Sequence, residues 1–242
     1  MKTKVFLAAI LAVGVLFTSC EKDHFDVIPS AKITTTDFPA SGVSQLAISD
    51  VFHVYVSFSE TEESVQIEAN ENLHSFIEMN QTGDLLSVGL AKNTNISGAP
   101  VLNVYITTTS LSKVLAEGAS SVEFYDALIN DQFEIELTGA SKFKGSLETG
   151  TLTTQISGAS EMEIDGVCTN FQIDASGASE MTGFSFVSDH LNADLTGGSE
   201  IALTVQQKLD VTASGASKVY YKGNGIIQSQ DLKDASQIIK MN

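Results

Sequence analysis

Serine hydroxyls at regular spacing are the first candidates for chemistry in this sequence. A serine nucleophile needs a base held within hydrogen-bond reach. Neither a Gly-x-Ser-x-Gly elbow nor a recurring histidine accompanies these serines, so we interpret them as structural and predict no catalytic residues. Each serine closes a phrase that recurs every 18 to 21 residues, namely Gly118-Ala119-Ser120, Gly139-Ala140-Ser141, Gly158-Ala159-Ser160, Gly177-Ala178-Ser179, Gly197-Gly198-Ser199 and Gly215-Ala216-Ser217.

Two rows of mostly acidic side chains could attract a cation. One row follows the serines and the other lies three residues before the glycines: Lys142, Glu161, Glu180, Glu200 and Lys218, and then Glu136, Gln155, Asp174, Asp194 and Thr212. Carboxylates stacked about 5 Å apart repel one another, and Ca²⁺ could relieve that repulsion with oxygen ligands. We favour a solvated acidic face flanked by lysines, because the chain lacks an Asp-x-Asp loop and a glycine-aspartate nonapeptide. We predict no metal ligand and no cofactor, with calcium as the open alternative.

The remaining reactive side chains do not form a recognisable site. Four histidines are scattered without the spacing of metal ligands: His24, His53, His74 and His190. Cys168 has Val167 and Phe171 as neighbours, which indicates a small apolar filler rather than a reactive thiol. An enzyme of the polysaccharide lyase or hydrolase kind is the catalytic alternative. A lyase needs cationic groups to stabilise a carbanion, and the chain has no arginine, so we predict that the protein is not an enzyme.

The regular period predicts a repeat architecture, in which one small unit stacks on copies of itself. Apolar residues alternate with polar ones before each turn, as in Phe133, Ile135 and Leu137 and, one copy later, Leu152, Thr154 and Ile156. Such alternation is typical of half-buried strands. Nineteen extended residues trace about 60 Å, which is enough for one circuit of a narrow coil. We predict an all-β, right-handed β-solenoid of parallel strands.

The glycine phrase is interpreted as the corner of each circuit. Glycine accepts a positive φ, alanine is small enough to stack, and the serine hydroxyl can cap a backbone group left unpaired by the bend. A last copy, Asp234-Ala235-Ser236, predicts a terminal rung, because aspartate tolerates the left-handed region. Residues 33–110 lack the phrase and predict a largely antiparallel β region. The solenoid is expected over residues 111–242, with 33–242 forming one continuous domain.

The N-terminus predicts export and lipidation. Lys2 and Lys4 precede an apolar run, Val5 to Phe17, that is too short to span a bilayer, so residues 1–19 are expected to be a signal peptide. Phe17-Thr18-Ser19-Cys20 resembles a bacterial lipobox, which implies that Cys20 becomes the lipidated first residue of the mature chain. Residues 20–32 are then a tether, and the lipid makes the outer membrane a partner. Surface exposure is slightly favoured over a periplasmic position.

Composition excludes one class of partner. After removal of residues 1–19 the chain carries 11 Lys against 30 Asp and Glu, a formal charge of 11 − 30 = −19. Such a surface repels phosphate backbones, so nucleic acid is not expected as a partner. A hydrophobic content of 43% is enough for a packed core.

Three features together resemble a known family of bacterial lipoproteins, the adhesins with a head GIN domain that are abundant in Bacteroidetes. They are the strand pair around Val51 to Phe58, the segment Leu115-Ala116-Glu117-Gly118-Ala119-Ser120, and the Ser-Gly-Ala-Ser copies that follow. The resemblance implies an all-β solenoid and an adhesion function with a glycan or protein ligand. A periplasmic scaffold that associates with itself is the alternative, and the sequence determines neither the ligand nor the oligomeric state.

Overall fold

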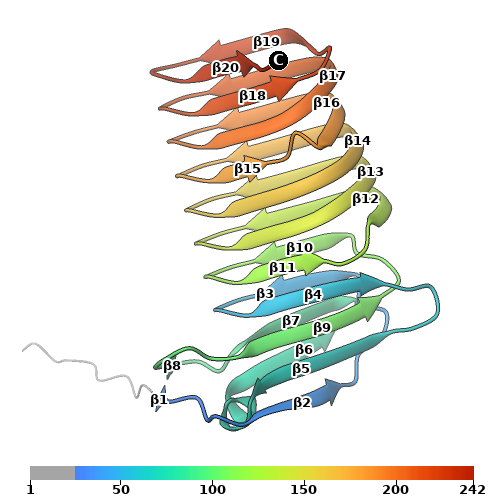
Figure 1. The fold of residues 1–242 in the computed structure, drawn as a ribbon, viewed down its shortest axis with the longest axis vertical. Helices are drawn as coiled ribbons and strands as arrows, with labels where there is room; N and C mark the ends of the chain where they lie inside the picture. The colour runs from blue at the N-terminus through green and yellow to red at the C-terminus, as the bar shows by residue number, and fades with distance from the viewer. Residues whose placement is uncertain (1–24) are drawn as a thin grey trace, which may run out of the picture.

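The computed structural model describes residues 25–242 and consists of strands that wind into a tall stack of rungs (Figure 1). The predicted signal peptide (residues 1–19), the predicted lipidation site Cys20 and His24 lie outside the described residues. Within residues 25–242, no helix combines the length and the apolar character needed to cross a membrane.

The solenoid itself is built from parallel strands, as predicted. In chain order these are β10 (Lys113–Ala116), β11 (Ser121–Phe124), β12 (Leu128–Leu137), β13 (Lys142–Ile156), β14 (Glu161–Ala175), β15 (Glu180–Thr182), β16 (Phe186–Leu195), β17 (Glu200–Ala213), β18 (Lys218–Lys222), β19 (Ile226–Leu232) and β20 (Gln237–Lys240). Each strand pairs with a strand about one repeat later, so that equivalent residues of successive repeats lie side by side. The predicted β-solenoid is confirmed.

The N-terminal region combines antiparallel and parallel pairing. Its elements are β1 (Phe25–Val27), β2 (Ile33–Phe38), β3 (Gln45–Ile48), β4 (His53–Phe58), β5 (Ser64–Asn70), the 3-10 helix η1 (Glu71–Phe76), β6 (Ile77–Thr82), β7 (Leu85–Leu90), β8 (Thr94–Ile96) and β9 (Leu102–Thr108). The predicted antiparallel region is present, since β5 pairs antiparallel with both β2 and β9, and β6 with β7. Parallel pairing, however, begins before residue 111. The strands β3 and β4 lie between β7 and β9 on one side and β10 and β11 on the other.

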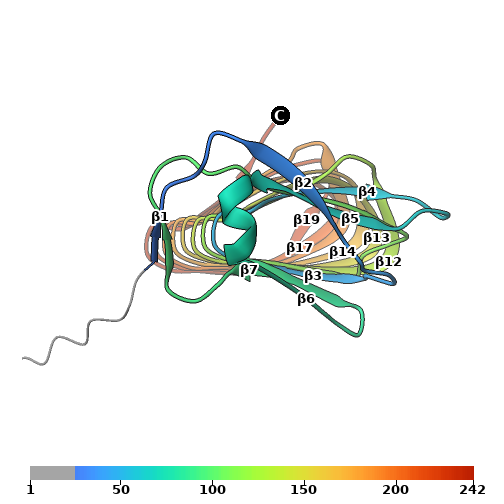
Figure 2. The same cartoon turned by 90° about the horizontal axis from the view of Figure 1, so that it is seen from below.

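The core is a set of ladders of identical positions. Phe133, Leu152, Phe171, Leu191 and Leu209 occupy one ladder, and each is at most 2% exposed. Burying such a side chain contributes about 1.5 to 3 kcal/mol. The N-terminal end of this core is covered by η1, whose Leu73 is fully buried. Figure 2 shows η1 and β2 in front of the coil when the molecule is seen from that end.

The corner of each rung has the geometry that the glycine phrase predicts. The corner glycines have φ between 77° and 79°, and a Cβ atom on any of them would lie 2.3 to 2.5 Å from the carbonyl oxygen of the preceding corner. The next residue donates its N–H to that same carbonyl, at 2.7 Å from Ala159 to Gly139. The serine hydroxyl donates to the carbonyl three residues earlier, at 2.9 Å from Ser160 to Ser157. Glycine is therefore required both by its φ and by the close approach of the neighbouring rung.

Aspartate occupies both ends of this stack of corners. Asp234 has φ 58°, which confirms the predicted terminal rung. Asp50 has φ 66° and forms the first corner, since its carbonyl accepts the N–H of Ala119. Its carboxylate accepts the N–H of Leu90 at 2.8 Å. The sequence did not reveal this first corner, because the glycine, alanine and serine positions are filled there by Asp50, Val51 and Phe52.

Candidate binding face

One outer face of the stack carries polar and aromatic side chains in rows that cross several rungs. We call it the front face and define it by the outward residues of β9, β4, β11, β13, β14 and β15. The first row contains Asn103, His53, Ser121, Lys142, Glu161 and Glu180, and the second contains Tyr105, Tyr55, Glu123, Lys144, Glu163 and Thr182. Parallel pairing in register aligns these positions, so residues distant in sequence form one surface.

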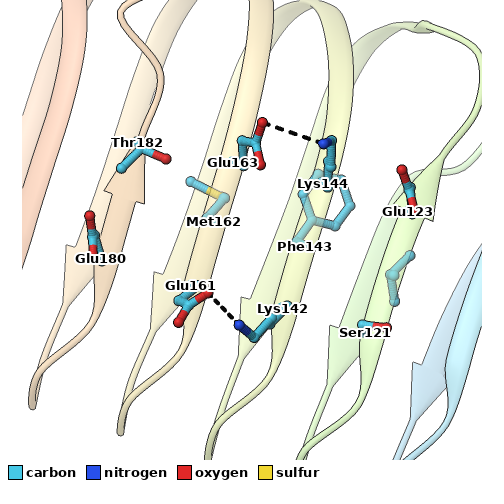
Figure 3. Close-up of a pocket in the computed structure, with 11 residues that line it drawn as sticks. Ser121, Glu123, Lys142, Phe143, Lys144, Glu161, Met162, Glu163, Glu180 and Thr182 are labelled. Carbon is cyan, nitrogen blue, oxygen red and sulfur yellow. Dashed lines mark hydrogen bonds and ion pairs between the residues drawn. The ribbon is translucent and has the colours of Figure 1, made fainter.

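An open groove of about 460 Å³ crosses the front face from β11 to β15 (Figure 3). Two ion pairs between β13 and β14 line it. The Nζ atom of Lys142 lies 2.6 Å from a carboxylate oxygen of Glu161, and that of Lys144 lies 3.5 Å from Glu163. All four side chains are more than half exposed, so these pairs contribute little to stability and remain available to a ligand.

The first predicted acidic row has the register that the repeat implied. Glu180 lies between Glu161 and Glu200 on adjacent rungs. Lys218 closes the row with a 2.6 Å contact to Glu200, and that hydrogen bond raises the pKa of the Lys218 ammonium. Lysines therefore neutralise both ends of the row, while Glu180 in the middle has a carboxylate on each side.

The second predicted row lies on a different outer face. Glu136, Gln155, Asp174, Asp194 and Thr212 are aligned on successive strands. Lys113 reaches this face, where its hydrogen bond to Glu134 raises the pKa of the ammonium. Among residues 25–242, no group of three or more histidine, cysteine or acidic side chains has the arrangement of a metal site. The structure adds nothing in favour of the calcium alternative.

Three tyrosines form a stack where the N-terminal region meets the solenoid. The ring of Tyr55 stacks on that of Tyr105 at 5.3 Å and on that of Tyr125 at 5.4 Å, measured between centroids. Glu68 accepts a hydrogen bond from the Tyr105 hydroxyl at 3.2 Å. Burial, followed by the charge of Glu68, raises the pKa of the Tyr105 phenol. Sequence reasoning missed this stack, because it depends on β4 pairing with β9 and with β11, which brings together residues far apart in the chain.

A second hollow, of about 580 Å³, adjoins the groove beside this stack. Tyr125 and Phe184 both line it, and both are exposed large apolar side chains. The Nζ atom of Lys222 lies 4.9 Å from the centroid of the Phe184 ring. The front face and this adjoining hollow together bring aromatic rings beside charged and hydroxyl groups.

Residues 43–225 match the family model described as "Putative auto-transporter adhesin, head GIN domain". The chain belongs to this family. The match covers both the N-terminal rungs and the solenoid, so the front face lies within the family domain. No curated protein sequence matches the chain.

Solved structures related to this head GIN domain share its fold. A putative adhesin from Bacteroides fragilis has a TM-score of 0.82 at 19% identity, over 89% of this chain and 100% of that chain. A putative adhesin from Parabacteroides merdae has a TM-score of 0.74 at 18% identity, over 90% and 99%. A putative lipid binding protein from Parabacteroides distasonis has a TM-score of 0.74 at 15% identity, over 90% and 100%. At these identities the likeness shows the fold alone.

Among residues 25–242, several side chains with catalytic potential are held in structural roles, and one pair lies on the surface. The corner serines, such as Ser160, are buried and donate to backbone carbonyls. Cys168 is buried and free, and burial raises the pKa of its thiol to about 11. On the front face the Nδ1 atom of His53 lies 2.7 Å from the Ser121 hydroxyl, a contact that sequence reasoning missed. Such a pair needs a group that orients the imidazole and donors for an oxyanion before it can transfer an acyl group.

Proposed function

We propose that this protein is a non-catalytic adhesion module, held on the cell envelope by lipid at Cys20, that binds a glycan or protein ligand through the front face. The observation that carries this proposal is the continuity of that face. A groove and an adjoining hollow are lined by exposed charged, hydroxyl and aromatic groups on neighbouring rungs. Solenoids commonly bind ligands through extended surfaces of this kind. The family description, which names an adhesin, supports the same function.

The anchor is the part of the proposal that rests on sequence. The lipobox-like segment ending at Cys20 would carry several acyl chains, which is enough for stable membrane attachment. The substitution Cys20→Ala is expected to abolish incorporation of radiolabelled palmitate and to move the protein from the membrane fraction to the soluble fraction. Retention of the label in the variant would contradict lipidation at this residue.

The location of the front face is tested by protease treatment of intact cells, compared with lysed cells, followed by detection of the C-terminal repeats. Loss of the repeats from intact cells is the result expected for a surface adhesin. Cells that carry the protein should then adhere to glycan-coated or host-protein-coated surfaces more than cells in which the gene is deleted.

Protection of the repeats until lysis would exclude the adhesin function and favour the alternative, a periplasmic scaffold. The scaffold also predicts self-association, which would appear as an increase in size with concentration on gel filtration. If the repeats are exposed on intact cells and the protein stays monomeric at high concentration, ligand binding is the function that agrees with both results.

A further inference from the structure

The hollow beside the tyrosine stack exists because the rungs differ in length at that edge of the solenoid. The strands β13 and β14 continue for 15 residues each through the bend. Their neighbours on the two sides are short, with 4 residues in β11 and 3 in β15. At each break a bend or turn interrupts the rung, and an aromatic residue occupies it. Tyr125 follows β11 and is 59% exposed, and Phe184 follows β15 and is 37% exposed.

The two aromatic rings stand on opposite sides of the hollow. They come from strands three rungs apart, a separation of about 14 Å at the usual spacing of paired strands. Between them lie polar side chains of the two long strands, namely Lys144, Ser146, Glu163 and Asp165. The hollow is therefore long enough for several small rings in a row and offers hydrogen-bonding groups along its length.

Both aromatic rings are held in place from outside the hollow. The ring of Tyr125 stacks on Tyr55 with an interplanar angle of 22°, which leaves its other face free of that contact. The ring of Phe184 has the ammonium of Lys222 over it, a favourable cation–π arrangement. Rings that are fixed before a ligand arrives lose little freedom on binding, which improves affinity.

This arrangement matches the chemistry of a pyranose chain. Each sugar ring has C–H groups on its faces, which pack on aromatic rings, and hydroxyl groups at its rim, which bond to carboxylates and serine hydroxyls. Charge selects among sugars. The residues lining the hollow include the carboxylates of Asp126, Glu163 and Asp165 against the single ammonium of Lys144, so an anionic sugar is repelled.

We propose that the hollow between Tyr125 and Phe184 is an oligosaccharide-binding site for neutral pyranose chains. This proposal names the ligand class for the proposed adhesion function. Only the biological use of the site rests on that function. Binding itself is a property of the described residues and is measurable on the isolated protein.

The test uses the full-length protein purified in mild detergent, with isothermal titration against four probes. Cellotetraose, mannotetraose and chitotetraose are the neutral probes, and tetragalacturonate is the anionic one. At least one neutral probe is expected to bind, and tetragalacturonate is not. For the probe that binds, Tyr125→Ala and Phe184→Ala should each raise Kd about tenfold, whereas Tyr125→Phe should leave it close to the wild-type value.

The matched control is Ile129→Ala, which removes a side chain that is 72% exposed and does not line the hollow. Its Kd should equal that of the wild type, and thermal melting should show that all variants fold. The proposal is overturned if no neutral probe binds, if tetragalacturonate binds better than every neutral probe, or if both alanine variants keep the wild-type Kd. None of these results would affect protease exposure or adhesion to a protein-coated surface, which test the proposed function separately.

Discussion

The two long edges of the solenoid differ in how regularly the backbone conformation repeats from rung to rung. At the corner edge the six inner corners, from Gly118 to Gly215, repeat one conformation, with a glycine at φ 77° to 79° followed by an N–H donated to the corner before it. At the opposite edge the rungs differ. The strands β13, β14 and β17 run through the bend, whereas other rungs break into turns there. The register also shifts between Ser188 and His190 and again between Leu209 and Asp210. The regular edge holds the stack together, and the irregular edge carries the exposed side chains of the proposed ligand site.

The largest expected effect separates two glycines of the same phrase. Gly158→Ala would place a Cβ atom 2.3 Å from the Gly139 carbonyl oxygen at a φ of 79°, and should cost about 4 kcal/mol or more of unfolding free energy. In Gly198→Ala the nearest backbone atom is 3.8 Å away, at a position where other corners already have alanine. That change should stabilise the protein by about 0.5 kcal/mol. Urea denaturation of both variants measures the contrast, and equal losses would contradict the corner model.

The second expected effect concerns Cys168, which lies toward the irregular edge. Its folded pKa of about 11 exceeds the ordinary value of 9.0 because of burial. A raised folded pKa means that stability is fully present below pH 9 and is lost as pH rises through 11. The loss should reach about 2 to 3 kcal/mol in the wild type and should be absent from the pH profile of Cys168→Ala. Parallel profiles for the two proteins between pH 8 and 11 would argue against a buried thiol.

A smaller effect is expected at the corner serines. Ser160→Ala removes the hydroxyl that donates to the Ser157 carbonyl, and should cost about 1 to 2 kcal/mol because that carbonyl loses a buried partner. Ser64→Ala, at an exposed strand position, is the control and should change stability by less than about 0.5 kcal/mol. A Ser160→Ala variant as stable as the control would show that the hydroxyl does not cap the corner.

The smallest effect is expected on the front face. Glu180 has Glu161 and Glu200 on the adjacent rungs, so Glu180→Gln should give a slight gain in thermal stability at low salt that disappears at high salt. Glu148→Gln is the control, because Glu148 lies between Ile129 and Val167 and faces no charge on either rung. A salt-independent gain at Glu180 would point to a cause other than repulsion.

The corner edge was predictable from sequence because each of its conformational constraints acts on a single residue position. A positive φ, a contact that excludes Cβ and a buried hydroxyl each select one residue type, so the phrase repeats at the six inner corners, from Gly118 to Gly215. The first corner at Asp50 was not predictable, because Asp50, Val51 and Phe52 replace the glycine, alanine and serine of the phrase. Aspartate tolerates a positive φ, and the carboxylates of Asp50 and Asp234 each accept a backbone N–H from the neighbouring rung.

The candidate site was less predictable for a related reason. The acidic row after the serines could be read from the period, and the structure confirms its register. Tyr125 and Phe184 occur at breaks in the repeat, where no offset is shared between copies. The Tyr55 and Tyr105 pairing depends on β4 lying beside β9, although 43 residues that include several strands separate the end of β4 at Phe58 from the start of β9 at Leu102. Such long-range topology leaves no periodic mark in the sequence.

The corner geometry also has a consequence for how such a chain can change over generations. At the corner edge each inner rung meets its neighbours through the same carbonyl, the same N–H and the same absent side chain, so inner rungs are interchangeable at that edge. A tandem duplication or deletion of one repeat therefore alters the height of the molecule without disturbing the joints on either side. The rung is the natural step by which this architecture grows or shrinks.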